Sequence, residues 1–251
     1  MMTRTLALLT SLMVLATATP AAAGDRVQNA AKVRALVTQL HKQRQVRLAH
    51  PQVAQRLSKE VSKSLGRQVT IKPEQIVQVE FNSHAHNQLR GVLGKTIGVG
   101  IYPSRLWGHN KLRVGNEAAD SVPGNSRAFP STGTKARVVG FGSMHKRFYE
   151  AVFAGTSAEV TKTSTAAHAA SGRYFKKGAN CASFVCEILR DAHGKDKKAF
   201  DGKLSSLMRG GSAGALWNNA VGAKPDLIIV YTPKGEFRSV ESPKFQFDYK
   251  E

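Results

Sequence analysis

The sequence predicts an α+β protein with one main domain. Two amphipathic helical patterns fill residues 25–66, strand-like alternation begins near residue 68, and another amphipathic helix follows Asn180. With 251 residues, 41% of them hydrophobic, the chain is long enough to bury a substantial core. We therefore expect a helical extension at residues 24–67 and a single α+β domain at residues 68–251.

The first 23 residues have the three parts of a secretory signal peptide. Arg4 is basic, Leu6–Ala16 is apolar, and Ala21–Ala23 provides small residues at the exit. The apolar run is too short to span a bilayer comfortably, and no later run is long enough for a transmembrane helix. We expect a mature chain that begins near Gly24 and is exported, either to the periplasm or as a secreted protein.

The chain is strongly basic, with a formal net charge of +20 and a pI of about 10.3. Such a charge favours anionic partners, and export makes peptidoglycan or another anionic envelope polymer a better candidate than nucleic acid, for which the chain shows no binding motif. Ten Lys and Arg residues lie between Arg26 and Arg67. That segment is expected either to bind an anionic surface or to pack across the domain.

Between residues 68 and 231, local patterns predict the remaining elements. Strands are expected at 68–72, 76–81, 83–89, 96–102, 137–141 and 226–231, and helices at 145–154 and 215–221. Residues 104–136 and 156–171 are expected to be connections, the first of them unusually long.

The most informative stretch runs from Tyr174 to Gly194. On a helix that begins after Asn180, Cys181 lies in the first turn on the apolar face, where the positive helix end favours a thiolate. This placement suits a nucleophile, and it also suits a small buried residue. Cys186 lies roughly 140° around the same helix, too far for a disulfide with Cys181. We interpret Cys186 as a packing residue.

A cysteine nucleophile needs a base within hydrogen-bonding distance. His84 and His86 are the best-placed histidines because they lie two apart on a predicted strand and share one face. The same two histidines with Cys181 are also metal-ligand types, so a zinc site is an alternative, although no fourth ligand is evident.

Several short motifs together resemble a known family. They are Ser83-His84-Ala85, Gly100–Pro103, Arg147–Val152, Tyr174, and the run NCASFVCEIL from Asn180. In this order they resemble the circularly permuted NlpC/P60 branch of the papain-like cysteine hydrolases. The resemblance covers roughly residues 76 to 194, and Ser83 stands where the group usually has glycine.

The resemblance implies a papain-like antiparallel half-barrel sheet packed on the helix that carries the nucleophile. Cys181 would be that nucleophile and His84 its base, with His86 left open as the alternative base. The orienting residue stays open among His86, Asn87 and Tyr102, and Tyr174, Tyr102 and Asn180 are candidates for lining the site. No metal or cofactor is implied.

The activity expected from this resemblance is hydrolysis of an amide bond in the peptide part of peptidoglycan, as an endopeptidase or amidase. The same group contains lipid-directed acyl hydrolases and acyltransferases. A second class of function is a non-enzymatic envelope protein that binds an anionic polymer through its basic residues.

Overall fold

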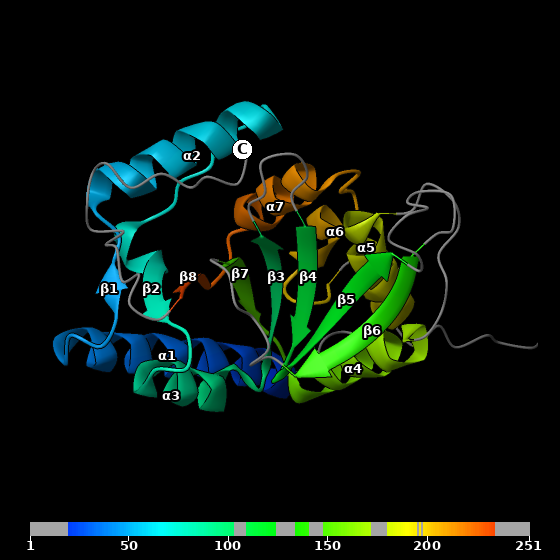
Figure 1. Cartoon of the computed structure of the whole chain (residues 1–251), viewed down its shortest axis with the longest axis horizontal. Coiled ribbons are helices and arrows are strands. Elements are labelled where there is room, and N and C mark those ends of the chain that lie inside the picture. The colour runs from blue at the N-terminus through cyan, green and yellow to red at the C-terminus, as the bar shows by residue number, and fades with distance from the viewer. Residues whose placement is uncertain are drawn as a thin grey trace, which may run out of the picture.

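The computed structural model describes residues 20–102, 109–123, 134–140, 148–171, 180–194, 196 and 198–233 (Figure 1). The helices in these ranges are α1 (Pro20–Lys42), α2 (Pro51–Leu65), η1 (a 3₁₀ helix, Pro73–Gln75), α3 (His84–Leu93), α4 (Ser157–Ala170), α5 (Cys181–His193), α6 (Leu204–Leu207) and α7 (Ala213–Gly222). The strands are β1 (Arg47–Leu48), β2 (Ile76–Glu80), β3 (Thr96–Tyr102), β4 (His109–Val114), β5 (Glu117–Pro123), β6 (Thr134–Gly140), β7 (Phe148–Ala154) and β8 (Leu227–Thr232).

The strands form one mixed sheet in the order β1-β2-β8-β7-β3-β4-β5-β6. Among the strand pairs in the described ranges, only β2–β8 is parallel, and the other neighbouring pairs are antiparallel. The fold is therefore a mixture of helices and a largely antiparallel sheet, and the α+β prediction is confirmed at that level.

Helices cover both faces of the sheet. Strand residues such as Val99 and Ile101 pack with α2, α4, α5, α6 and α7 in one core cluster. Strand residues that point to the opposite face, such as Val79 in β2 and Ile229 in β8, pack with α1 and α3 in a second cluster. Figure 1 shows α2 and α7 above the sheet and α1 and α3 below it. We call these the α5 face and the α3 face.

A buried charged cluster lies on the α3 face. The Arg113 guanidinium pairs with the Glu150 carboxylate and also donates to the backbone oxygens of Leu93 and Gly115, at 3.1 and 2.8 Å. The Tyr231 hydroxyl donates to Glu150 Oε2 at 2.9 Å. Because buried charges are costly unless they are paired and hydrogen-bonded, these contacts are what make the cluster tolerable. They link β4, β7 and β8 across β3.

The segment 24–67 is part of the core rather than an arm attached to it. Helix α1 packs on the α3 face, β1 pairs with β2, and α2 packs on the α5 face. Arg26 pairs with Glu159 at 2.7 Å and with Asp201, which joins α1 to the start of α4. Helices α1 and α2 therefore pack on opposite faces of the sheet.

Several predicted elements are wrong. Residues 145–154 were expected to be helical, but residues 148–154 form β7, which is buried along its whole length. A strand buried on both faces shows no alternation, so its short apolar run resembles a helical segment. Residues 109–123 form β4 and β5 within an expected loop, and residues 68–72 are not a strand.

The expected connection at 156–171 is helix α4. Its many Ser and Thr residues lower helix propensity, but Thr156 and Glu159 form a reciprocal capping box that starts the helix. Other predictions are confirmed: β2, β3 and β8 match expected strands, and α2 ends before Gly66, which adopts the left-handed conformation (φ 63°) common after helices.

The predicted signal peptide, residues 1–23, lies largely outside the described residues, and Tyr174 lies wholly outside them. Among the helices that the structure describes, none is both long and apolar enough to cross a membrane.

Candidate functional site

Helix α5 begins where the sequence predicts, because Asn180 caps it. The Asn180 side chain accepts from Ser183 N at 2.9 Å, and Ser183 Oγ accepts from Asn180 N at 2.8 Å. This reciprocal pair fixes the first turn. Asn180 also donates through Nδ2 to Gly211 O at 3.0 Å, which ties the helix start to the loop before α7. Asn180, expected to line the site, thus positions Cys181 as the first helical residue.

The Cys181 sulfur atom lies against the side-chain amide of Asn110. The Cys181 Sγ to Asn110 Oδ1 distance is 3.9 Å, and Cys181 is half-buried. Asn110 itself is fully buried at the start of β4, and its Nδ2 donates to Gly100 O at 3.1 Å and to Ala213 O at 3.3 Å. These two carbonyls fix the amide, so its oxygen is the atom that faces the thiol.

Asn110 belongs to a row of residues across the end of the sheet. The strand register places Asn110 opposite Ile101, Ile101 opposite Tyr149, Tyr149 opposite Val230, and Val230 opposite Gln78. Neighbouring residues in register share a face, so the polar members of this row all lie on the α5 face of the sheet. The Trp217 ring of α7 lies 6.3 Å from the Tyr149 ring. Sequence patterns gave no signal for this row because it is assembled from five separate strands, and its polar members come from β4, β7 and β2.

The second cysteine has a different environment. Cys186 is buried, and its thiol donates to Leu207 O at 3.0 Å. Burial raises the pKa of the Cys186 thiol above its ordinary value, which disfavours the reactive thiolate. Neither cysteine forms a disulfide. Both expectations for Cys186, a packing role and no pairing with Cys181, agree with the structure.

The predicted histidine strand is wrong. His84 and His86 lie in the first turn of α3, because Ser83 caps a helix there by accepting from His86 N at 3.1 Å. His84 is exposed and contacts Gln88 at 2.9 Å. His86 is fully buried on the α3 face, with its ring 5.5 Å from Phe81 and 5.7 Å from Tyr231. The sheet separates both histidines from Cys181, so the structure does not bring these three residues together.

Tyr102 and Asn87 also lie away from Cys181. The Tyr102 ring packs against Phe148 on the α3 face, with 4.6 Å between ring centroids, and Lys111 Nζ lies 5.0 Å from its centre. Asn87 is an exposed residue of α3. His109 stands next to Asn110 in β4, but alternation directs it to the Tyr102 side, where the two rings are 6.3 Å apart.

Metal binding by Cys181, His84 and His86 together is contradicted by their separation. Within the described part of the chain, no group of three His, Cys, Asp or Glu side chains is arranged to hold a metal ion.

Comparison with known proteins adds no relationship. No protein-family model matches the chain, and neither the curated proteins nor the solved structures contain a significant match.

Proposed function

We propose that this chain is a thiol-dependent acyl hydrolase of the cell envelope, with Cys181 as its nucleophile. The observation that carries the proposal is the placement of Cys181: a half-buried thiol at the first residue of a 13-residue helix, against a fixed amide at the end of the sheet. Helix starts stabilise negative charge, and a nucleophilic sulfur must be accessible as well as oriented.

The architecture around Cys181 supports a papain-like arrangement. In such folds, the nucleophile lies in the first turn of a helix that packs on an antiparallel sheet, and here α5 packs on β4 and β5 of the antiparallel part. The departures are the additional strands β1, β2 and β8 and the absence of His84 and His86 from the cysteine side of the sheet.

In the proposed chemistry the Cys181 thiol loses its proton to a base other than His84 or His86, since both histidines lie across the sheet. The thiolate attacks a carbonyl carbon, and backbone N–H groups of the first turn, including that of Ala182, stabilise the oxyanion. The leaving group departs with a proton from water, and a second water hydrolyses the thioester to regenerate the thiol.

The first candidate substrate is an amide in the peptide part of peptidoglycan, as expected for an exported basic protein. An acyl ester is the second candidate. It is favoured by the position of His84 and His86, because an alkoxide leaving group depends less than an amine on protonation by a nearby histidine.

The test compares wild type, Cys181→Ala, Cys186→Ala and His84→Ala on purified peptidoglycan and on p-nitrophenyl butyrate. We expect Cys181→Ala to lower the rate at least about 100-fold, because it removes the covalent nucleophile. Cys186→Ala is the matched thiol control and His84→Ala the control for the base. Both should keep the wild-type rate within about threefold, since neither side chain contacts the reacting sulfur in this proposal.

Iodoacetamide labelling of the native protein provides a second measurement. Cys181 should be alkylated in the folded state, and Cys186 only after unfolding. The proposal is wrong if wild type hydrolyses neither substrate, or if Cys181→Ala retains wild-type activity. A large loss of activity in His84→Ala would instead overturn the conclusion that His84 is not the base.

A further inference from the structure

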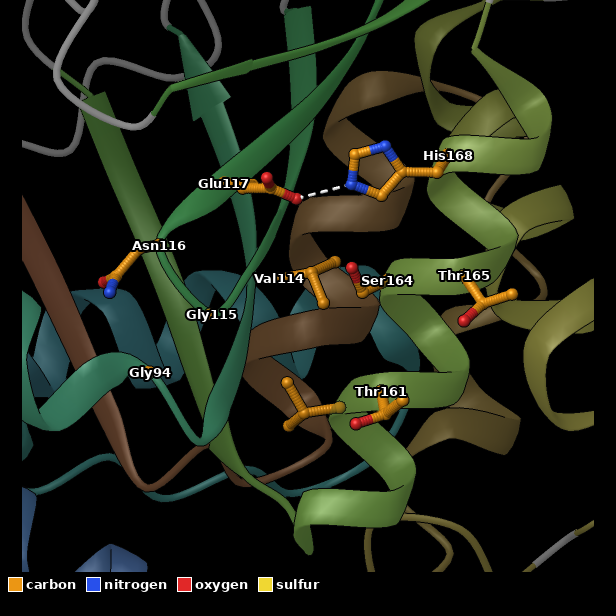
Figure 2. A pocket seen from close by; sticks show the side chains of 10 residues that line it. Gly94, Val114, Gly115, Asn116, Glu117, Thr161, Ser164, Thr165 and His168 are labelled. Atoms are coloured by element: carbon orange, nitrogen blue, oxygen red, sulfur yellow. Dashed lines mark hydrogen bonds and ion pairs between the residues drawn. The ribbon is translucent and has the colours of Figure 1, made fainter.

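A groove of about 390 Å³ lies between α4 and the hairpin that joins β4 to β5 (Figure 2). Its volume is within the range of small-molecule sites. The hairpin and the end of α3 supply one wall, and α4 supplies the other. The lining residues are Gly94, Val114, Gly115, Asn116, Glu117, Val160, Thr161, Ser164, Thr165 and His168.

The α4 wall is a row of hydroxyl groups. Thr161, Ser164, Thr165 and His168 are spaced by three and four residues, so they share one face of the helix. Figure 2 shows Thr161 and Ser164 projecting from α4 toward the hairpin. Within the part of the chain that the structure describes, the hydroxyls of Thr161, Ser164 and Thr165 make no hydrogen bond. Each can therefore donate to and accept from a ligand.

The groove contains one ionisable pair among its described lining residues, His168 and Glu117. His168 Nε2 and Glu117 Oε2 are 2.7 Å apart, and both side chains are about half exposed, at 54% and 48%. No Lys or Arg is among the described residues that line it. An anion would thus meet the Glu117 carboxylate with no Lys or Arg among the described lining residues to compensate it, and a cation would compete with the hydrogen bond between Glu117 and His168.

A serine-nucleophile triad does not fit these residues. Figure 2 shows the His168 nitrogen that is not bonded to Glu117 on the side of the ring away from Ser164. The groove is therefore better suited to binding than to proton transfer.

We propose that this groove binds a neutral saccharide unit. Sugar hydroxyls both donate and accept hydrogen bonds, as do the Thr, Ser and Asn116 side chains that line the groove. Val114 and Val160 offer a limited apolar patch for ring C–H groups, too small for a lipid chain. The ligand class follows from many neutral hydrogen-bonding groups, from the lack of Lys and Arg among the described lining residues and from a volume larger than an ion requires.

This site is distinct from Cys181. Asn110, which contacts Cys181, is at the beginning of β4, whereas Val114 and Glu117 flank the turn at its other end. Four residues of extended strand separate the two positions by roughly 13 Å. The groove proposal thus does not depend on the hydrolase proposal.

The test is an NMR titration of the full-length ¹⁵N-labelled chain with chitotetraose and with maltotetraose, two neutral saccharides that differ in their N-acetyl groups. Inorganic phosphate is the anionic comparator. We expect saturable shifts of the Gly94, Gly115 and Thr165 amide signals with at least one saccharide, and none with phosphate. Thr165→Val with Ser164→Ala should weaken binding about tenfold, as expected for loss of two hydrogen bonds.

Ser157→Ala is the matched control, because Ser157 is an exposed residue of the same helix outside the groove. It should bind as wild type, and so should Cys181→Ala. The proposal is overturned if neither saccharide shifts these amides, if phosphate shifts them equally, or if the Ser164/Thr165 variant binds as tightly as wild type.

Discussion

Cys181 and Cys186 belong to one helix, but their sulfur atoms have different surroundings. Cys186 donates to a backbone carbonyl inside the core, whereas Cys181 is half-buried beside the Asn110 amide. Helical geometry was sufficient to predict from sequence that the two cysteines lie on different faces of the helix. The contact with Asn110 was not predictable, because the partner lies 71 positions away in a stretch that has the composition of a loop.

His84 and His86 lie in a helical turn where the sequence predicts a strand. Two histidines at i and i+2 share a face only in a strand, and Ser83 instead caps a helix in which they diverge. His84 becomes exposed and His86 becomes buried. Their separation from Cys181 follows from this local change and from the side of the sheet on which α3 packs.

Burial of His86 makes folding stability depend on pH. Burial, with a smaller contribution from Arg90, lowers the pKa of His86 to about 4. In the unfolded chain the same imidazole titrates near its ordinary value, so between these values the unfolded state binds more protons and stability falls as pH falls. We expect a loss of about 2 kcal/mol in unfolding free energy between pH 7 and pH 5 from this residue.

Urea denaturation at pH 7 and pH 5 measures this effect. The difference between the two pH values should shrink by about 2 kcal/mol in His86→Gln, which has no titrating group. The pKa of His193 is also lowered by burial, and this contribution remains in the variant. An unchanged pH dependence in His86→Gln would contradict the assignment.

Within strand β3, two glycines create space for side chains of β7. A Cβ atom at Gly98 would overlap the Glu150 carboxylate, and one at Gly100 would overlap the Phe148 ring. The glycine pattern Gly98-Val99-Gly100 therefore serves packing on the α3 face, while Val99 and Ile101 fill the core on the α5 face. The strand itself was predictable from sequence, but this reason for its glycines was not.

Gly98→Ala should destabilise the protein by about 3 kcal/mol or more, because displacing Glu150 strains a packed core and disturbs a buried ion pair. Gly91→Ala is the matched control. It lies in α3, and a Cβ atom there meets nothing within 4 Å. That substitution should stabilise by about 0.5–1 kcal/mol through helix propensity. Thermal denaturation followed by circular dichroism measures both changes, and equal stability of the two variants would contradict this account.

At the scale of the whole molecule, the N-terminal helices belong to both helical layers: α1 packs on the α3 face of the sheet and α2 packs on the α5 face. The ion pair between Arg26 and Glu159 joins α1 to α4. Burial alone would favour the protonated form of Glu159. The Arg26 guanidinium and the backbone N–H groups of Thr156 and Phe200 outweigh burial and lower the pKa of Glu159. The carboxylate is thus held charged by partners from three parts of the chain.

Arg26→Met keeps an aliphatic side chain and removes the charge that pairs with Glu159. We expect a loss of about 3 kcal/mol in unfolding free energy, because a nearly buried carboxylate loses its partner. Arg34→Met is the control in the same helix. Arg34 is exposed and contacts Asp226 at 3.5 Å, so we expect a change of less than about 1 kcal/mol. Urea denaturation of both variants tests this, and equal losses would contradict a structural role for Arg26.

The sequence by itself determined the mixed α+β character, the capped start of α5, the strands β2, β3 and β8, and the difference between Cys181 and Cys186. These features depend on local periodicity and capping, which short segments carry by themselves. Only the tertiary structure decided which groups meet: Asn110 with Cys181, His86 with Tyr231, and Arg26 with Glu159. Such contacts depend on strand order and on which sheet face each helix covers, and no local pattern encodes either.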